Sequence, residues 1–442
     1  MTALTITPVA GVSDGDLQRL SPTGVASYGP LAAQSSIIEM TCMHSKFVLS
    51  ISGARRYNSA LCLAPEWEEN SAMRICFVSS CKHWGGGEQL LASLIEGLAA
   101  ERQEVSLVAR RSAPLANWGR ERMLARLLEL PGRGRSPRSL WRLRRWLVRQ
   151  RAEVVVLNDP HAIFSGALAA LGLDVRRLGV RHTVFPIRST RKHNWLLDAV
   201  ICVSAAAERE CLAAGIRQER ITVIHGGVPR PKLSADNLRR VRELFGQSGD
   251  QNILAIGSLL PVKGFDTLVR AVARGVAAGR QWRLWMAGDG PMRGSLSTLA
   301  NELGVAGRVH FLGFRDDIGE LLAEADLFVS ASHSEGLSLV LIEAMLARCP
   351  IAATAVGGSG EVLGTDANGR TPLAETFTPG DAAGLAAAID RSLLPAPAGQ
   401  MRLDRAERWA QESFSIEQMA EKHLALYRKL LAADTSLRRA AA

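Results

Sequence analysis

Two glutamates that stand eight residues apart carry the clearest chemical signal in this sequence. Glu335 comes just before Gly336, Leu337 and Ser338, and Glu343 follows within a strongly apolar stretch. If this stretch is a helix, the spacing keeps both carboxylates near one helical face. The N–H groups at the start of such a helix form a site for phosphate groups. We therefore expect a diphosphate site at the start of this helix. An acid among apolar neighbours needs a partner or a ligand, so Glu343 is a second candidate for a ligand contact.

A lysine and two further turns extend the pattern. Gly257 and Ser258 follow one predicted strand and lead to Lys263, whose charge would lie at the end of the sheet that faces a cleft. Gly288 lies in a second strand-end turn with little side-chain bulk. Taken singly, Lys263 could be a solvated surface lysine and Glu335 a carboxylate that favours a helix start. The combination of these residues at strand ends is what predicts a binding site.

A glycine-rich turn, residues 85–87, follows the first predicted strand and opens a helix. Gly86 and Gly87 would let backbone amides approach an anion near the helix start. The turn is not the GxGxxG fingerprint of dinucleotide binding. By itself it could also be a tight connection between a strand and a helix.

Short apolar runs alternate with helical patterns from Met73 onward. The runs do not alternate with polar residues, which is typical of parallel sheets covered on both faces. The sequence therefore predicts an α/β protein with two Rossmann-like, doubly wound domains that face each other across a cleft. The predicted strands are residues 75–79, 105–109, 154–157, 200–203, 221–224, 253–256, 284–287, 309–312, 327–329 and 351–354. The predicted helices are residues 88–100, 162–171, 265–278, 292–303, 318–323, 339–347 and 401–431.

Length and composition bound the class of protein. The chain has 442 residues, with 47% hydrophobic and 22% charged residues, which excludes wholesale disorder and low-complexity architectures. Its seven cysteines form no pair with the two-residue spacing of a zinc or redox motif, which favours reduced thiols in a cytoplasmic protein. No apolar run approaches the roughly 18 residues that a membrane span needs.

We expect four segments along the chain. Residues 1–72 have few periodic patterns and are interpreted as a disordered leader or a miscalled start, with Met73 as the alternative initiator. Residues 73–235 form the first domain and residues 236–410 the second, with a polar linker at residues 230–250. Residues 411–442 form a C-terminal helix that packs back on the first domain.

An arginine-rich segment accounts for almost all of the net charge of +10. Residues 120–151 hold eleven arginines against two glutamates, a balance of +9. Residues 139–151 could form a basic amphipathic helix for an anionic lipid surface or a lipid-linked acceptor, or a solvated helix whose tryptophans pack on the core. No recognition module for nucleic acid accompanies the segment. The residues that would form the patch are Arg142, Arg144, Arg145, Arg149, Trp141 and Trp146.

The motifs taken together resemble the retaining family 4 glycosyltransferases of the GT-B fold, over residues 73–432. The most specific match is the run from Glu335 to Glu343, which is similar to the E-x7-E motif of that family. Supporting matches are Trp84-Gly-Gly-Gly-Glu88, Lys263-Gly264, Gly288-Asp-Gly-Pro291 and Val356-Gly-Gly358 with Glu361.

This resemblance implies roles for the residues named above. Glu343 would accept hydrogen bonds from the ribose of a nucleotide-sugar donor, and Glu335 would contact the transferred sugar. Lys263 and the amides at 336–338 would hold the diphosphate, with the 85–87 turn approaching from the first domain. His161 would be the first-domain histidine near the sugar. His182 and His333 are weaker candidates, which would be structural or would support the residues that touch the ligand. The implied reaction is sugar transfer with retained anomeric configuration, without a metal or other cofactor.

Three positions depart from the family pattern. Ser258 stands where the family usually has an arginine that pairs with the diphosphate, so one charge-assisted contact is missing. His225-Gly-Gly-Val-Pro229 replaces the common Asn-Gly-Val-Asp, and Cys349 replaces a small glycine. Alternatives to a glycan or glycolipid transferase of cell-surface polysaccharide or lipopolysaccharide synthesis are therefore an inactive GT-B scaffold, motivated by Ser258, and a GT-B nucleotide-sugar epimerase. The paired glutamates argue against the epimerase. The enzyme would act in the cytoplasm or at the inner face of the cytoplasmic membrane.

Overall fold

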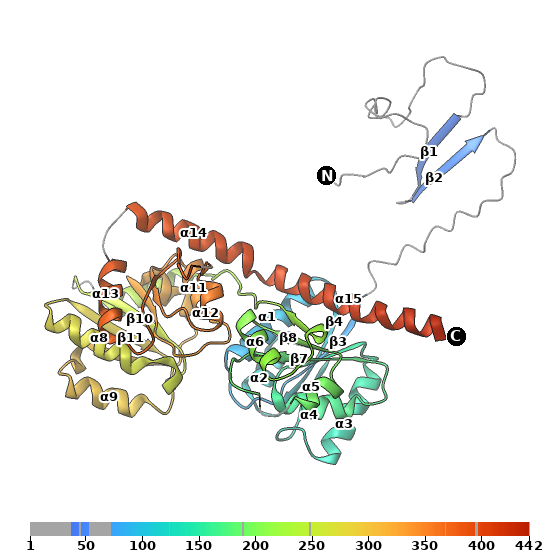
Figure 1. Cartoon of the computed structure of the whole chain (residues 1–442), viewed down its shortest axis with the longest axis horizontal. Helices are drawn as coiled ribbons and strands as arrows, with labels where there is room; N and C mark the ends of the chain where they lie inside the picture. The colour runs from blue at the N-terminus through green and yellow to red at the C-terminus, as the bar shows by residue number, and fades with distance from the viewer. Residues whose placement is uncertain are drawn as a thin grey trace. The chain divides into compact units, whose positions relative to one another are not determined.

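The computed structural model describes residues 37–43, 46–52, 72–122, 124–187, 190–246, 249–366, 368–393 and 397–441 (Figure 1). The chain divides into two units, Met1–Ser71 and Ala72–Ala442. In the first unit, β1 (Ile37–Met43) and β2 (Lys46–Ser52) pair as an antiparallel ladder. The interpretation of residues 1–72 as a disordered leader or miscalled start falls mostly on residues outside the described ranges and stays a prediction.

A seven-stranded sheet forms the centre of the N-terminal domain. Its strand order is β5-β4-β3-β6-β7-β8-β9, and every neighbouring pair is parallel. The strands β6 and β8 are buried along their whole length, which explains why they read as unbroken apolar runs. The strands are β3 (Arg74–Val78), β4 (Glu104–Arg110), β5 (Leu127–Leu130), β6 (Val154–Leu157), β7 (Arg176–Arg181), β8 (Ala199–Cys202) and β9 (Ile221–Val223).

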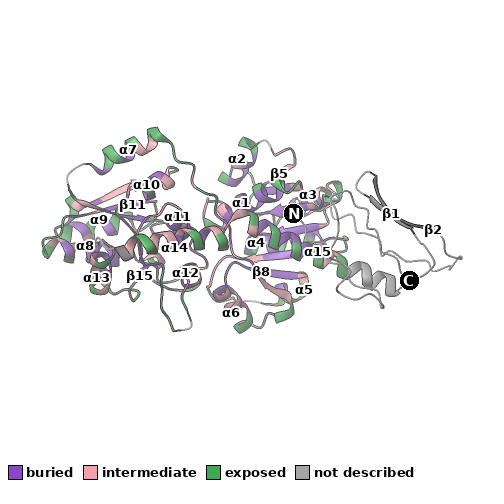
Figure 2. Cartoon of the chain, turned by 90° about the horizontal axis from the view of Figure 1, so that it is seen from above, coloured by how far each residue is buried: buried purple, intermediate pink, exposed green. Residues whose placement is uncertain are grey.

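Helices flank this sheet and supply the apolar side chains that bury it. Leu91, Ile95 and Leu98 of the first helix lie in one core cluster, whereas Leu143 and Leu147 of the third lie in another. Figure 2 shows the strands as a buried layer with exposed outer helix faces. The helices are α1 (Gly86–Ala100), α2 (Pro114–Glu121), α3 (Pro137–Arg149), α4 (Pro160–Ala169), α5 (Arg191–Leu196) and α6 (Ala205–Ala213).

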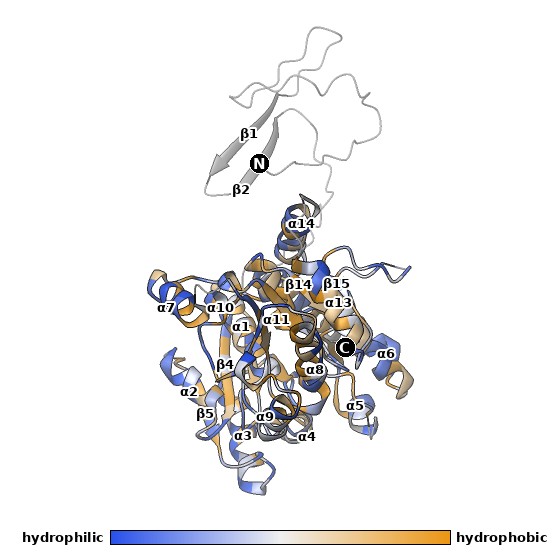
Figure 3. Ribbon diagram, turned by 90° about the vertical axis from the view of Figure 1, so that its left-hand side faces the viewer, coloured by the Kyte–Doolittle hydropathy of each residue, from blue (hydrophilic) through white to orange (hydrophobic). Residues whose placement is uncertain are grey.

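A six-stranded parallel sheet forms the C-terminal domain in the order β12-β11-β10-β13-β14-β15. In Figure 3 its strands are hydrophobic while helices such as α7 turn hydrophilic faces outward. The strands are β10 (Gln251–Ile256), β11 (Trp282–Ala287), β12 (Val309–Gly313), β13 (Leu327–Ser330), β14 (Ile351–Ala353) and β15 (Glu375–Thr376). The helices are α7 (Ala235–Phe245), α8 (Phe265–Ala277), α9 (Arg293–Glu302), α10 (Ile318–Glu324), α11 (Leu339–Leu346), α12 (Gly358–Val362) and α13 (Ala382–Leu393).

Two C-terminal helices run along both domains (Figure 1). The indole N–H of Trp409 on α14 (Pro397–Ser413) donates to the carbonyl of Val362 in the C-terminal domain, at 3.0 Å. Ile416 and Ala420 of α15 (Ile416–Ala441) lie against Gly97 of α1 in the N-terminal domain. The chain therefore crosses between the domains a second time where α14 ends and α15 begins.

The prediction of two doubly wound parallel domains is confirmed, and the differences are local. Three strands of the two domains are not predicted: β5, the two-residue β15, and β7, in which three of the six residues are arginines. Most of the expected polar linker at 230–250 is the helix α7, whose Val241 and Phe245 are buried. Within the described ranges, no helix combines the length and apolar character that crossing a bilayer requires.

Candidate functional site

A cavity of about 430 Å³ lies between the two domains, and both contribute to its wall. From the N-terminal domain come the start of α1 and residues 182–185, which follow β7. From the C-terminal domain come the ends of β10 and β13 and the residues after them. The C-terminal ends of parallel strands are where doubly wound sheets bind ligands, so the fold itself places a site here.

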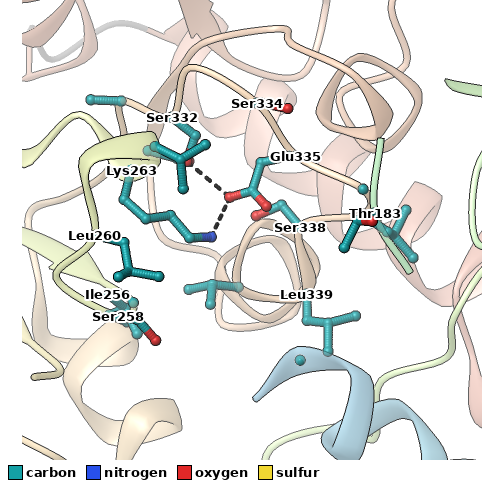
Figure 4. Close-up of a pocket in the computed structure, with 18 of the residues that line it drawn as sticks. Thr183, Ile256, Ser258, Leu260, Lys263, Ser332, Ser334, Glu335, Ser338 and Leu339 are labelled. Atoms are coloured by element: carbon teal, nitrogen blue, oxygen red, sulfur yellow. Dashed lines mark hydrogen bonds and ion pairs between the residues drawn. The ribbon is translucent and has the colours of Figure 1, made fainter. Parts of the chain in front are cut away.

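An ion pair lies at the centre of the C-terminal wall (Figure 4). The Nζ of Lys263 lies 2.5 Å from the Oε1 of Glu335, and the hydroxyl of Ser332 donates to the same oxygen at 2.8 Å. The Glu335 side chain is 11% exposed and that of Lys263 is 28% exposed. The buried Glu335 carboxylate therefore has a positively charged partner, as a buried charge requires. The Lys263 side chain is exposed enough to contact a ligand in the cavity as well.

The turn after Glu335 presents backbone amides to the cavity. Gly336, Leu337 and Ser338 line the wall and lead into α11. Within the described part of the chain, their N–H groups donate to no backbone carbonyl, so they can bind an anion. A Cβ on Gly336 would lie 1.9 Å from the carbonyl oxygen of His182, so only glycine fits between the two domains.

Glu343 lies farther along α11 and does not line this cavity. Burial raises the pKa of its carboxyl group to about 7. The structure thus places Glu343 on the same helix as the amide turn, in an environment that favours the neutral acid until a partner compensates its charge.

Of the predicted residues in the glycine-containing turns, four line the cavity and one lies behind it. Gly86, Gly87, Gly257 and Ser258 line the cavity, and Ser258 is exposed there. Gly288 lies outside the lining, and a Cβ at this position would meet the carbonyl oxygen of Gly257 at 2.0 Å. Gly288 therefore allows two strand-end turns to pack together, and it supports the turn that carries Ser258.

His182, a weaker site candidate from the sequence, lies in the cavity wall. The Nε2 of His182 lies 2.8 Å from the Oδ1 of Asn158, whose Nδ2 donates to the carbonyl of Gly87 at 3.3 Å. Desolvation lowers the pKa of His182 to about 4, so its ring is neutral at pH 7. His182 directly follows β7, and because that strand was missed, the sequence carried no signal for its position.

His161, predicted to lie near the sugar, is not part of the cavity lining. It lies in the first turn of α4, where its backbone N–H donates to the Asp159 carboxylate at 2.9 Å. The same carboxylate accepts hydrogen bonds from the backbone and side chain of Ser80. Asp159 therefore fixes the start of α4 and the turn after β3, and His161 belongs to that arrangement.

Glu88 is a buried acid of the N-terminal domain that the sequence reading did not single out as a site residue. It lies in the first turn of α1, and desolvation raises its pKa. The hydroxyl of Ser79 donates to its Oε1 at 3.5 Å. The Glu88 carboxylate thus lies between Ser79, which follows β3, and Gly85 of the glycine-rich turn.

The helix expected at residues 139–151 is α3, and its residues divide between solvent and core. Trp141 is 59% exposed, whereas Trp146 packs against the core cluster around Leu143 and Leu147. Arg144 donates to the carbonyls of Ala169 and Leu171 at the end of α4. Arg145 and Arg149 are exposed and Arg142 is half-buried. Of the six predicted patch residues, Trp146 is therefore half-buried and packs on the core instead of facing solvent fully.

The exposed side of α3 continues onto α4. Phe164, Leu168 and Leu171 are each about 40% exposed or more. The Arg145 guanidinium lies 5.3 Å from the Trp141 ring centre, and that of Arg135 lies 5.0 Å from the Phe164 ring centre. Arginines thus cover the edges of a partly apolar surface, which we call the α3–α4 surface.

Two family models match the chain, one in each domain. Residues 84–230 match the model described as Glycosyltransferase Family 4, and residues 250–394 match the model described as Glycosyl transferases group 1. The two matches leave residues 231–249 between them, which include α7.

Curated proteins with similar sequences are glycosyltransferases. The 2-deoxystreptamine glucosyltransferase of Streptomyces kanamyceticus is 31% identical over 55% of this chain. The lipopolysaccharide core biosynthesis glycosyltransferase LpsE of Rhizobium meliloti is 34% identical over 39%, and the lipopolysaccharide glucosyltransferase WaaG of Escherichia coli is 32% identical over 36%. The matched segments span 64%, 48% and 44% of the length of these relatives.

Solved structures share the fold. HepE from Anabaena, crystallised with UDP and glucose, superposes with a TM-score of 0.71 over 80% of this chain and 99% of its own, at 21% identity. A sucrose-phosphate synthase from Thermosynechococcus elongatus superposes with a TM-score of 0.65 over 81% of this chain and 99% of its own. The arrangement of the two domains is therefore that of GT-B proteins.

Proposed function

Because this chain belongs to the group 1 glycosyltransferases of family 4, we propose that it moves a sugar from a nucleotide-sugar donor to a glycan or glycolipid acceptor. The observation that carries the proposal is the Lys263–Glu335 pair beside the amides of residues 336–338. The lysine charge and the N–H groups at the start of the helix can bind the anionic diphosphate. The Glu335 carboxylate can accept hydrogen bonds from sugar hydroxyls. The names of LpsE and WaaG support cell-surface polysaccharide or lipopolysaccharide synthesis as the setting.

The proposed donor is a uridine diphosphate sugar held by the C-terminal domain. HepE, which shares the fold, was crystallised with UDP and with UDP-glucose, and this supports uridine as the base. Lys263 and the amide turn bind the diphosphate, and Glu335 accepts hydrogen bonds from the transferred sugar. Glu343 is half-buried on α11 beyond the cavity lining. We propose that the ribose extends past the lining residues and donates hydrogen bonds to it, which compensates the cost of its charge in an apolar environment.

The proposed reaction breaks the bond between the anomeric carbon and the diphosphate oxygen. An acceptor hydroxyl forms the new bond on the same face, and its proton passes to the departing phosphate. Anomeric configuration is therefore retained without an enzymatic nucleophile. Lys263 and the amides at 336–338 stabilise the negative charge that grows on the leaving group, and this role is proposed to need no metal.

The test is a transfer assay preceded by a binding screen. Thermal unfolding is measured with UDP, GDP and ADP and with their sugars, because a ligand that binds the folded protein raises its stability. The sugars whose nucleotide binds are then tested for release of free nucleotide by the wild type and by Glu335→Ala. Release by the wild type that is lost in the variant supports the proposal.

A donor-binding scaffold without activity is the second candidate, and Ser258 favours it. This residue is exposed in the cavity where the family usually has an arginine, so the diphosphate meets one cation fewer. A nucleotide that stabilises the protein without any release from its sugar would favour the scaffold over the enzyme.

The acceptor side of the proposal concerns the α3–α4 surface. We propose that it docks on anionic lipid at the cytoplasmic face of the membrane, where a lipid-linked acceptor would lie. The support is the exposed Trp141, Phe164 and Leu168 beside Arg145 and Arg149, since apolar side chains can enter the headgroup region while arginines meet lipid phosphates.

Liposome sedimentation tests this docking. Binding of the wild type to vesicles with anionic lipid, and not to neutral vesicles, is expected. The variant Trp141→Ser with Arg145→Ser and Arg149→Ser should lose it. The control is Phe314→Ser with Arg239→Ser and Arg240→Ser, which removes an exposed aromatic residue and two exposed arginines of the C-terminal domain. Equal binding by the two triple variants would contradict the proposal.

A further inference from the structure

The carboxylate of Glu361, in the C-terminal domain, is held by groups of the N-terminal domain. Glu361, on α12, accepts hydrogen bonds from the backbone N–H groups of Ala205 and Ala206 at 2.8 and 2.9 Å. The Nε2 of His225 lies 2.8 Å from its Oε2. The side chain is 23% exposed and does not line the donor cavity. Glu361 therefore joins the two domains outside the proposed chemistry.

The two amides belong to the start of α6, where a helix has unpaired N–H groups and a partial positive charge. The hydroxyl of Ser204 satisfies the next amide, that of Ala207, at 3.1 Å. Burial alone would raise the pKa of Glu361, but the hydrogen bonds from His225 and from the two amides outweigh it and lower the pKa below its ordinary value. The helix of one domain is thus capped by the carboxylate of the other.

His225 lies where the chain first passes between the domains. It follows β9. Its ring packs edge-to-face with the Phe414 ring, with 5.6 Å between the two ring centres. The N–H of Val228 donates to the carbonyl of Phe414 at 2.9 Å, so the first crossing lies against the second, between α14 and α15. A Cβ on Gly227 would lie 2.5 Å from the carbonyl oxygen of Ser415. His225 therefore links Glu361 to the segment about which the domains would move.

The opposite end of α12 packs on the donor turn. The N–H of Gly358 donates to the carbonyl of Glu335 at 3.0 Å. A Cβ on Gly358 would lie 2.0 Å from the carbonyl oxygen of Gly336 and 3.0 Å from the Cβ of Ser204. A five-residue helix thus touches the proposed sugar-binding turn at its start and the N-terminal domain near its end.

We propose that Glu361 and His225 form an interdomain clasp that holds the N-terminal wall of the cavity, including His182, against the donor turn. Both are positioning residues, since neither touches the cavity. The clasp would act mainly on transfer, which needs both domains. It would affect donor binding less, because Lys263 and the amides at 336–338, the main proposed partners of the diphosphate, lie in the C-terminal domain. Its effect on catalysis rests on the proposed function, whereas its effect on domain closure does not.

The experiment compares the full-length wild type with Glu361→Ala, Glu361→Gln and His225→Asn. Glu375→Ala is the matched control, because Glu375 is a similarly shielded carboxylate whose partners Arg391 and Arg402 lie within the C-terminal domain. Hydrogen exchange at the start of α6 and small-angle scattering report closure. UDP affinity and transfer rate at saturating UDP-sugar are measured on the same samples.

Glu361→Ala should speed exchange at the start of α6, increase the radius of gyration and lower the transfer rate about tenfold or more, while UDP affinity stays largely unchanged. Glu361→Gln should lie between this variant and the wild type, because its carbonyl oxygen still accepts one amide. His225→Asn should change the same readouts in the same direction even if Glu361→Ala does not fold, and Glu375→Ala should change none of them.

Unchanged exchange and scattering in Glu361→Ala and His225→Asn would overturn the clasp, as would a UDP affinity that falls as far as the transfer rate. If the wild type transfers no sugar, the proposed function fails, but exchange and scattering still decide whether the clasp exists.

Discussion

The Nζ of Lys263 lies 2.5 Å from the Oε1 of Glu335, so the lysine that faces the cavity is held by the carboxylate next to it. The two residues come from different strand ends of the same sheet, 72 positions apart in the chain. A diphosphate that binds here must share or replace the carboxylate as the partner of the lysine. Glu335 then becomes free to accept hydrogen bonds from the sugar.

Replacing Glu335 with glutamine should separate binding from transfer. The amide no longer competes for Lys263, so UDP affinity should stay equal or rise, while the transfer rate falls because the sugar loses its charged acceptor. Lys263→Ala should instead lower the transfer rate about 100-fold, since it removes a donor to the charge that develops on the leaving group. Calorimetry with UDP and initial-rate kinetics measure the two effects. Weaker UDP binding by Glu335→Gln than by the wild type would contradict this relationship.

Restoring the missing cation should strengthen donor binding. Ser258 is exposed in the cavity wall and has room for a longer side chain. In Ser258→Arg, one new charge-assisted hydrogen bond to the diphosphate should raise UDP affinity about tenfold. Ser258→Gln, of similar reach but without charge, is the control. Titration calorimetry of the two variants checks the prediction, which fails if arginine and glutamine behave alike.

Glu343 should make the protein less stable at high pH. Burial raises its pKa in the folded protein to about 7, above the ordinary value of 4.5. Its stabilising contribution is therefore fully present below pH 4.5 and is lost as the pH rises through 7. Glu343→Gln, which stays neutral, should be more stable to unfolding than the wild type at pH 8, by roughly 3 kcal/mol, and the difference should be small near pH 5. Thermal unfolding at the two pH values measures it.

UDP binding by Glu343→Gln provides a second measurement for the Glu343 prediction. The variant that is more stable at pH 8 should bind UDP more weakly than the wild type, because it no longer offers a carboxylate to the ribose. A stability difference that is the same at both pH values would show that charge at this position is not the cause.

The two histidines at strand ends should differ in their effect on transfer. His182 lines the cavity and His161 does not, so His182→Ala should lower the transfer rate at least tenfold while His161→Ala retains most of it. Because the pKa of His182 is about 4, its ring should cause no change in rate between pH 6 and 8. Parallel rate measurements on the two variants test this, and equal losses would contradict it.

Strands that are buried on both faces could be predicted from the sequence. Strands whose polar residues are accommodated by contacts with distant parts of the chain could not. Unbroken apolar runs identified β6 and β8, but the arginines of β7 concealed a strand. Lys263 and the amide turn could be predicted together because both follow strands of one parallel sheet. His182 could not, because its strand was hidden. The contact between Glu361 and His225 joins residues 136 positions apart, and nothing in either local sequence predicts it.

The central claim is that Lys263 and Glu335 serve transfer from a nucleotide-sugar. The most direct measurement is release of UDP from a panel of UDP-sugars by the wild type, Lys263→Ala and Glu335→Gln, with folding checked by thermal unfolding. The account predicts release by the folded wild type with at least one sugar and a loss of about 100-fold in Lys263→Ala. Release at the same rate by all three proteins, or by none of them when UDP itself stabilises the wild type, would contradict it.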